Sequence, residues 1–460
     1  MVKPSIVLIV LLLSLLIAPC LPAADENEGS HSFLAWASRS LHPLATVETT
    51  ASRSDLAPLR RMIGSAKLVA LSEAGHDGAE PLAFRNRMLQ YLVEELGFTA
   101  IAIESGLTES QVVYDYVLEG AGDLKSVMTR GFSWTFDRYP QNEALVRWLK
   151  EYNANPKHQR KVRFYGFDMP GSPGNSMAKR DLRTALAAAL NYLKSVDSNA
   201  AADFQGRIDP QLQFMHFNPY PRSETETQYS QLSATDRDRL TASIADLISL
   251  LERRAATYAA ASSDQAYRWA YRHALGARQI DTWLRRIPPN WKLTGAFVRS
   301  ELLWQLHETR DRAMADNLKW IVEQEGSDGR ILIFANRFHL SMVPFTSNIL
   351  ETGLPGYPFG WYLKQEFGTR LVTIGHFVGG GAIGCGFRLD VRPDTSFDGV
   401  LSGLTSPMFL LDIRTAPPNV RSWLEREHDI WSPPQNFRVP IARAFDVIFF
   451  TRTSTPACAQ

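Results

Sequence analysis

Short apolar runs recur along the chain, and several of them end in a residue that carries a carboxylate or an amide. Their length is typical of buried β-strands, and the early runs alternate with segments of helical spacing. This alternation predicts an α/β fold with a largely parallel central sheet covered by helices on both faces. The expected strands lie at 67–71, 100–103, 162–167, 330–335, 371–377, 408–413 and 445–450, and the early helices at 80–96, 109–119 and 142–153.

The middle third of the chain has a different pattern. Residues 178–196, 235–262 and 264–286 show long helical periodicity, whereas residues 204–230 are loop-like and rich in Pro, Asn and aromatic residues. No break in composition marks a free linker. We therefore expect a long helical insertion at about 175–325 that packs against the sheet.

The N-terminus is typical of a secretory signal peptide over residues 1–24. An apolar segment at 6–17, interrupted only by Ser14, is followed by small residues and then by an acidic stretch, which favours cleavage near Ala23 or Ala24. The apolar segment is short for a membrane span, so we expect no stable span in the mature chain. We expect one mature domain over residues 25–460 in a secreted or periplasmic protein.

Composition and charge exclude some classes of partner. Lys and Arg total 49 against 48 Asp and Glu, and no long basic run is present, so neither nucleic acid nor an anionic membrane surface is expected to bind. Cys20 resembles the cysteine of a lipoprotein signal, but the proline directly before it fits poorly. In an oxidising compartment Cys385 and Cys458 can pair, and two separate thiols remain an equal alternative. No oligomeric state follows from the sequence.

The stretch 68–85 places reactive side chains directly after a strand. Its apolar run ends in Glu73, and His76 follows three residues later in a loop with two glycines. Arg85 lies in the early turns of the next helix, where its guanidinium can pair with a carboxylate or hold a substrate oxygen. A plain salt bridge from Arg85 to Glu80 or Glu104 is the alternative.

Three further strands end in polar residues, namely Glu104, Asp168 and the pair Asn336 and His339. The carboxyl ends of parallel strands meet at one edge of a sheet, so we expect these groups to converge on a single cleft. A histidine beside a carboxylate can act as a general base, and a second histidine with an arginine can stabilise an oxyanion. The set predicts direct attack of water on a carbonyl group.

Two competing chemistries have weaker support. A serine hydrolase needs its nucleophile on a strand-to-helix turn, and the nearest approach, the GxSxA sequence at 174–178, follows a Pro/Gly loop instead. His and carboxylate ligands for a metal are present, but there is no HExxH and no compact ligand spacing. We expect no cofactor and leave a divalent metal as an open alternative.

These residues resemble those of the erythromycin esterases. That family carries a G-E-x-x-H-G segment after its first strand and an E-F-F-x-x-R helix start, which correspond here to residues 72–78 and 80–85. The resemblance extends over about 55–385, through residues 92–98, the strand ending in Glu104, residues 131–134, 164–168 and 310–317, and the glycine-spaced segment 360–375.

The resemblance implies hydrolysis of a small-molecule carboxylic ester, such as the lactone of a macrolide antibiotic. Carried over by position, the proposed general base of the family falls on His76. Supporting groups fall on Glu73, Arg85, Glu104 and His339, and we assign Asp168, Asn336 and Trp134 to substrate binding.

The chain departs from the family pattern near both histidines. Ser72 stands where the family usually has Gly, Asp77 where it has Gly or an aromatic residue, and Asn336 and Arg337 where it has His and Asn. Two alternatives therefore stay open. One is hydrolysis of another ester or amide, and the other is a non-catalytic protein that binds a metal or small ligand in the same cleft.

Overall fold

The computed structural model describes residues 23–169, 171, 180–214, 216–217, 229–288, 301–345, 356–385, 388–390, 396–431 and 437–458. The apolar segment of the expected signal peptide and the GxSxA sequence at 174–178 lie outside these residues. Within them, no helix has the length and apolar character that a membrane crossing requires.

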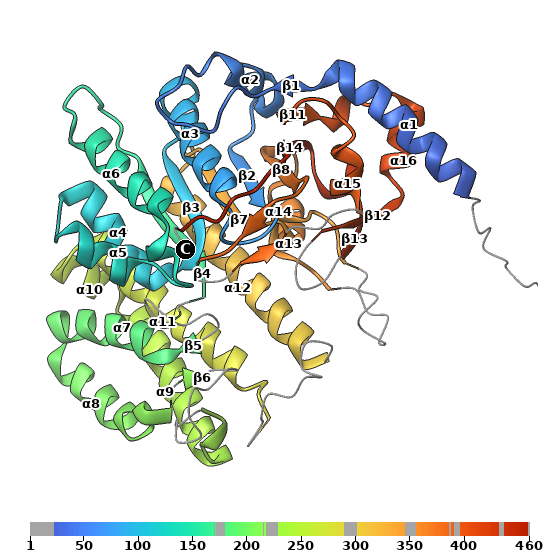
Figure 1. The fold of residues 1–460 in the computed structure, drawn as a ribbon. Helices are drawn as coiled ribbons and strands as arrows, with labels where there is room; N and C mark the ends of the chain where they lie inside the picture. The colour runs from blue at the N-terminus through green and yellow to red at the C-terminus, as the bar shows by residue number, and fades with distance from the viewer. Residues whose placement is uncertain are drawn as a thin grey trace, which may run out of the picture.

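An eight-stranded sheet forms the centre of the molecule, in the order β1-β11-β14-β8-β2-β7-β3-β4 (Figure 1). Neighbours from β14 to β4 are parallel, and β1 and β11 extend the sheet antiparallel at one side. The predicted fold class is therefore confirmed. The strands are β1 (His42–Pro43), β2 (Leu68–Glu73), β3 (Ala100–Gly106), β4 (Arg163–Asp168), β7 (Ile331–Asn336), β8 (Leu371–Val378), β11 (Met408–Asp412) and β14 (Val447–Thr451).

Alternate residues of β2 enter two different cores, as expected for a strand covered on both faces. Val69 and Leu71 pack with α3 (Ala79–Leu96) and α6 (Pro140–Ala154). Leu68 and Ala70 pack with α12 (Glu301–Glu325) and α14 (Phe359–Phe367). The helices of these two layers are α2 (Pro58–Ile63), α3 (Ala79–Leu96), α4 (Leu107–Glu119), α5 (Leu124–Gly131), α6 (Pro140–Ala154), α12 (Glu301–Glu325), α13 (Arg337–Leu340) and α14 (Phe359–Phe367).

The helical insertion has a core of its own, and its helices lie together at the bottom of Figure 1. They are α7 (Leu182–Val196), α8 (Ser198–Ile208), α9 (Ala234–Arg253), α10 (Ala255–Ala261) and α11 (Asp264–Leu284). Helix α12 joins the two parts, because Ala313 packs on the insertion and Met314 on the sheet. The predicted loop at 204–230 is wrong in its first half, where α8 and a 3-10 helix (Asp209–Phe214) bury Phe204 and Ile208.

The C-terminal part packs on the antiparallel side of the sheet around a third core. Its helices are α15 (Phe397–Leu401), α16 (Pro418–Leu424) and α17 (Ile441–Ala444), and the N-terminal helix α1 (Ala23–Ser40) packs in the same core through Phe33 and Ala37. Short two-stranded ladders join β5 (Arg180–Asp181) to β6 (His216–Phe217), β9 (Ala382–Ile383) to β10 (Leu389–Asp390), and β12 (Glu427–Ile430) to β13 (Phe437–Pro440). The boundary of a single mature domain at residue 25 stays a prediction.

Candidate active site

Strands β2, β7, β3 and β4 are consecutive neighbours in the sheet, so their carboxyl ends share one edge. Glu73, Asn336, Glu104 and Asp168 lie at or near these ends, within strands that are almost wholly buried. The sheet therefore brings together the polar groups that the sequence places after four separate apolar runs.

Glu73 holds His76 across the loop that follows β2. Nδ1 of His76 donates to Oε1 of Glu73 at 2.6 Å, and Nε2 lies 3.8 Å from Oε1 of Glu104. The His76 side chain is 39% exposed, whereas the two glutamates are 3% exposed. Burial lowers the pKa of His76, but the carboxylates of Glu104 and Glu73 outweigh it and raise the pKa to about 9. Glu73 thus fixes Nδ1, and Nε2 faces Glu104 at a distance longer than a hydrogen bond.

His339 lies near the same oxygen of Glu104 as His76 does. Its Nε2 lies 3.4 Å from Oε1 of Glu104, and its Nδ1 forms an ion pair with Asp311 at 2.7 Å. Burial and the guanidinium of Arg310 lower the pKa of His339, but Asp311 and Glu104 raise it to about 9. Glu104 therefore lies between two imidazoles that both favour the protonated form.

Arg310, on α12, joins the ends of β3 and β4. Its Nη2 donates to Glu104 at 2.6 Å and to Asp168 at 2.9 Å, and Nη1 lies 3.0 Å from Nε2 of His339. Burial raises the pKa of Glu104, but His339, His76 and Arg310 together hold it well below its usual range. The centre of the site is thus a carboxylate that is ionised and surrounded by cations.

A comparison with known proteins places the chain in a family. The sequence model described as Erythromycin esterase matches residues 93–454, which is most of the chain. The chain belongs to the erythromycin esterase family. Erythromycin esterase type II of Escherichia coli is 24% identical over 324 residues, covering 70% of this chain and 71% of the relative. Putative hydrolase YbfO of Bacillus subtilis (strain 168) is 22% identical over 423 residues, covering 87% of this chain and 85% of the relative. Relatives named esterase and hydrolase identify a family of hydrolases.

Solved structures share the fold of this erythromycin esterase family member. A Bacillus cereus protein superposes with a TM-score of 0.74 at 23% identity and covers 94% of this chain and 99% of its own. A succinoglycan biosynthesis protein superposes with a TM-score of 0.73 at 21% identity, covering 95% and 99%. At these identities the likeness establishes the fold alone.

Arg85 occupies a position that its sequence motif does not reveal. Its guanidinium is buried, donates to Oδ1 of Asn86 at 2.8 and 3.1 Å, and lies 4.9 Å above the ring of Phe334. The alternative of a plain salt bridge to Glu80 or Glu104 is not what the side chain forms, because Glu80 accepts hydrogen bonds from Thr455 and Glu104 pairs with Arg310. Burial lowers the pKa of Arg85 to about 9, and the carboxylate of Glu73 opposes this shift.

Asp168 and Trp134 face each other inside the protein. The carboxylate of Asp168 is fully buried and accepts from Arg310, from Arg180 at 3.2 Å and from Nε1 of Trp134 at 2.9 Å. The guanidinium groups of Arg310 and Arg180 lie 4.8 and 4.4 Å from the Trp134 ring. With these partners Asp168 anchors Arg310, and its contact with substrate stays a prediction.

Asn336 and Arg337, the two departures before His339, have structural partners. Asn336 caps α13, because its side-chain Oδ1 accepts from the backbone amide of Phe338 at 2.9 Å. Its backbone amide donates to Oε2 of Glu104 at 2.8 Å. Asn336 thus supports the turn and Glu104, and its substrate contact stays a prediction. Arg337 is fully buried and pairs with Asp398 at 2.9 Å, while its side chain also donates to the carbonyl of His376. Arg337 thus anchors the turn that carries His339.

The sequence interpretation omitted Arg310 and Asp311 from the site. Both belong to a motif at 310–317 that the resemblance had already identified, and they are adjacent on α12, which reaches the strand ends from the insertion. Asp311 also accepts from the amide of Phe359 at 2.9 Å, which ties α14 to the same point. The motif at 310–317 could thus have identified these two residues as candidates. That their side chains reach the carboxyl edge of the sheet follows only from the fold.

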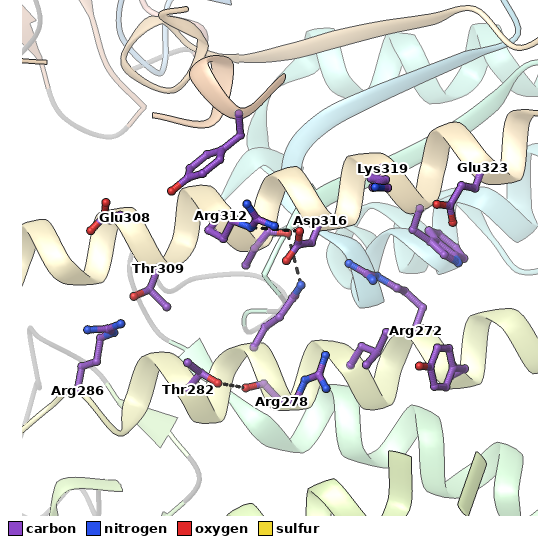
Figure 2. A pocket seen from close by; sticks show the side chains of 16 residues that line it. Arg272, Arg278, Thr282, Arg286, Glu308, Thr309, Arg312, Asp316, Lys319 and Glu323 are labelled. Carbon is purple, nitrogen blue, oxygen red and sulfur yellow. Dashed lines mark hydrogen bonds and ion pairs between the residues drawn. The ribbon is translucent and has the colours of Figure 1, made fainter. Parts of the chain in front are cut away.

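A metal centre was the open alternative for the site. In the described part of the chain, no group of three or more His, Cys, Asp or Glu side chains is arranged to hold a metal ion. A separate groove of about 670 Å³ lies between α11 and α12, and Arg310 is not among its lining residues (Figure 2). Two of its cations are already paired, Arg312 with Asp316 at 3.3 Å and Lys319 with Glu366 at 3.1 Å. None of the residues predicted for the site lines this groove.

Proposed function

We propose that the protein hydrolyses a carboxylic ester by direct attack of water, with His76 as the general base. The observation that carries the proposal is the orientation of His76 between Glu73 and Glu104. A carboxylate at Nδ1 fixes the ring and stabilises its protonated form, and Nε2 of this partly exposed side chain is then the atom that can accept a proton.

The reaction needs no covalent enzyme intermediate. Nε2 of His76 takes a proton from water while the water oxygen bonds to the ester carbonyl carbon. The tetrahedral oxyanion then collapses, the bond to the leaving alkoxide breaks, and the alkoxide takes the proton from His76. The products are a carboxylic acid and an alcohol, and no cofactor takes part. Arg310 and protonated His339, which lie next to the same oxygen of Glu104 as His76 does, supply positive charge that favours the developing oxyanion.

The resting protonation state sets the pH at which this mechanism works. With a pKa of about 9, His76 carries a proton in most molecules at neutral pH. Roughly one molecule in a hundred then has the neutral base at pH 7. The proposal therefore requires activity that rises with pH.

The substrate class rests on the curated relatives. Two of them are named erythromycin esterases, of type II and type I, which supports a macrolide lactone as one candidate substrate. We also propose that the protein is exported, because the disulfide described below persists in oxidising compartments.

The proposal is tested by mass spectrometry of a panel of macrolides and simple esters incubated with the protein. Addition of one water to a substrate, lost in His76→Ala and retained with a chelator present, supports it. His158→Ala is the matched control, because His158 stacks on Tyr152 in another part of the molecule and should leave turnover unchanged. No hydrolysis by the intact protein, together with a stoichiometric bound metal, would favour the binding protein instead.

A further inference from the structure

The loop that carries His76 is held at Asp77 by two distant parts of the chain. Asp77 has a φ of 71°, in the left-handed region that only a few non-glycine residues occupy. Its carbonyl accepts from the amide of Ala457 at 2.8 Å and from the amide of Gly384 at 3.2 Å. This backbone conformation persists where surrounding contacts hold it in place.

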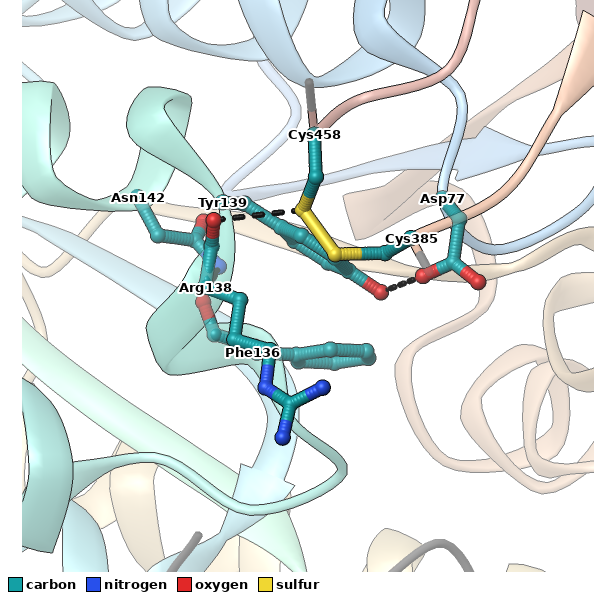
Figure 3. The surroundings of a disulfide bond; sticks show 7 residues. All are labelled: Asp77, Phe136, Arg138, Tyr139, Asn142, Cys385 and Cys458. Atoms are coloured by element: carbon teal, nitrogen blue, oxygen red, sulfur yellow. Dashed lines mark hydrogen bonds between the residues drawn. A yellow bond between two sulfur atoms is a disulfide. The ribbon is translucent and has the colours of Figure 1, made fainter. Parts of the chain in front are cut away.

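A disulfide joins the two segments that supply these amides. Cys385 follows Gly384, Cys458 follows Ala457, and the two cysteines are bonded across 73 residues of sequence (Figure 3). The pairing left open by the sequence is thus decided. Because each donor lies next to one half-cystine, the covalent bond keeps both amides on the same carbonyl oxygen.

The side chain of Asp77 has a partner of its own. Its carboxylate accepts a hydrogen bond from the hydroxyl of Tyr139, and both residues are buried. The ring of Tyr139 lies 5.2 Å from that of Phe136, which in turn lies 5.5 Å from the imidazole of His76. Asp77 is therefore held at its backbone and its side chain, directly after His76.

The C-terminal segment continues these contacts into α3. The amide of Ala79 donates to the carbonyl of Thr455 at 2.8 Å, and Glu80 accepts from the amide and hydroxyl of Thr455 at 2.9 and 2.7 Å. Residues 77–80 are thus bonded at several points to a tail that the disulfide fastens. A tail that only shielded the loop from solvent would not need these specific hydrogen bonds to residues 77–80.

We propose that Asp77, held by Tyr139 and by the segments that the Cys385–Cys458 disulfide joins, is a positioning residue for His76. Asp77 touches no substrate in this proposal; it acts by keeping the imidazole between Glu73 and Glu104. The catalytic consequence rests on the function proposed above, whereas the effect on the ring and loop does not. Reduction of the disulfide would then displace the general base.

The test compares the oxidised protein, the protein after reduction and reoxidation, and the variants Cys385→Ser/Cys458→Ser and Tyr139→Phe. Tyr229→Phe is the matched control, because Tyr229 is a buried tyrosine that donates to a carboxylate, Asp281, in the helical insertion. Two measurements require no substrate. One is hydrogen exchange of the 74–80 amides, and the other is the pKa of the His76 ring by NMR, with its signal assigned by comparison with His76→Gln. Turnover is measured on any ester found to react, well below the melting temperature.

Breaking the disulfide should raise exchange at 74–80 by about tenfold or more and move the ring pKa from about 9 toward its ordinary value. kcat should fall by about tenfold to a hundredfold with KM nearly unchanged, and reoxidation should restore it. Tyr139→Phe should act in the same direction with the disulfide intact, which keeps the test decisive if the double serine variant does not fold. A lower melting temperature with unchanged loop exchange and ring pKa would overturn the proposal. If exchange and ring pKa respond but no form hydrolyses an ester, the positioning role stands and the esterase proposal fails.

Discussion

Nε2 of His76 lies 3.8 Å from Oε1 of Glu104, which is also the oxygen that Arg310 binds at 2.6 Å. One carboxylate oxygen therefore faces both the candidate base and a permanent cation. Because Arg310 and His339 hold the pKa of Glu104 well below its usual range, its carboxylate stays ionised and can raise the pKa of His76. This relationship leads to predictions for individual side chains.

Replacing His76 tests the base directly. His76→Ala should lower kcat/KM on a responsive ester by about two to four orders of magnitude, the usual contribution of a general base. Steady-state kinetics against His158→Ala measures the effect. A variant with the turnover of the wild-type protein would exclude His76 as the base.

The pH profile follows from the raised pKa of His76. Only the neutral imidazole can accept a proton, so log(kcat/KM) should rise with unit slope below pH 9 and stop rising near the pKa of about 9, where His339 also loses the proton that favours the oxyanion. A profile measured in overlapping buffers of constant ionic strength checks this. Activity that falls between pH 6 and pH 9 would show that the protonated ring is the active form.

Glu104→Gln separates the charge of Glu104 from its shape. Loss of the carboxylate removes the largest influence that raises the pKa of His76, so the rising limb of the pH profile should move to lower pH. Arg310 retains Asp168 as a partner, which should keep the variant folded. An unmoved limb would mean that Glu73 alone sets the protonation of the ring.

Strand ends were predictable from the sequence because a parallel sheet has a simple rule. Glu73, Glu104 and Asp168 each follow an apolar run, and adjacency in the sheet then brings them together. Arg310 lies on a helix more than 140 residues after Asp168 in the chain. No local sequence pattern indicates which part of the sheet such a helix will pack against. The same holds for the Arg337–Asp398 pair and the disulfide, whose partners are separated by 61 and 73 residues.

Arg85 shows a second limit of a correct motif. Its register with the family motif placed it in the early turns of α3, but a side chain on a helix can point to either side of a nearby strand. It lies over Phe334 of β7, where its cation is desolvated and paired with an amide rather than a carboxylate. The position of Arg85 in the chain and in α3 was predictable from the motif. Its chemical partner was not, because that depends on how α3 packs against distant elements.

Arg310 should also be the main structural ion of the site. Arg310→Met leaves Glu104 and Asp168 buried without their shared cation, which should lower the free energy of unfolding by about 3–5 kcal/mol. Arg147→Ala is the control, because Arg147 forms an exposed pair with Glu143 worth at most about 0.5 kcal/mol. Denaturant titration of both variants at pH 7 makes the comparison. Equal small losses would contradict a central role for Arg310.

Stability and activity should respond to pH in opposite directions. His339 is 5% exposed and its pKa is raised from 6.5 to about 9, so its favourable contribution is fully present below pH 6.5 and is lost as pH rises through 9. That contribution is on the order of 3 kcal/mol, and His76 adds a smaller amount because its side chain is 39% exposed. The free energy of unfolding from denaturant titrations should therefore fall between pH 6.5 and pH 9.5, while turnover through His76 rises. His339→Gln should flatten this fall, and a wild-type stability that is constant over the same range would contradict the charged state assigned to His339.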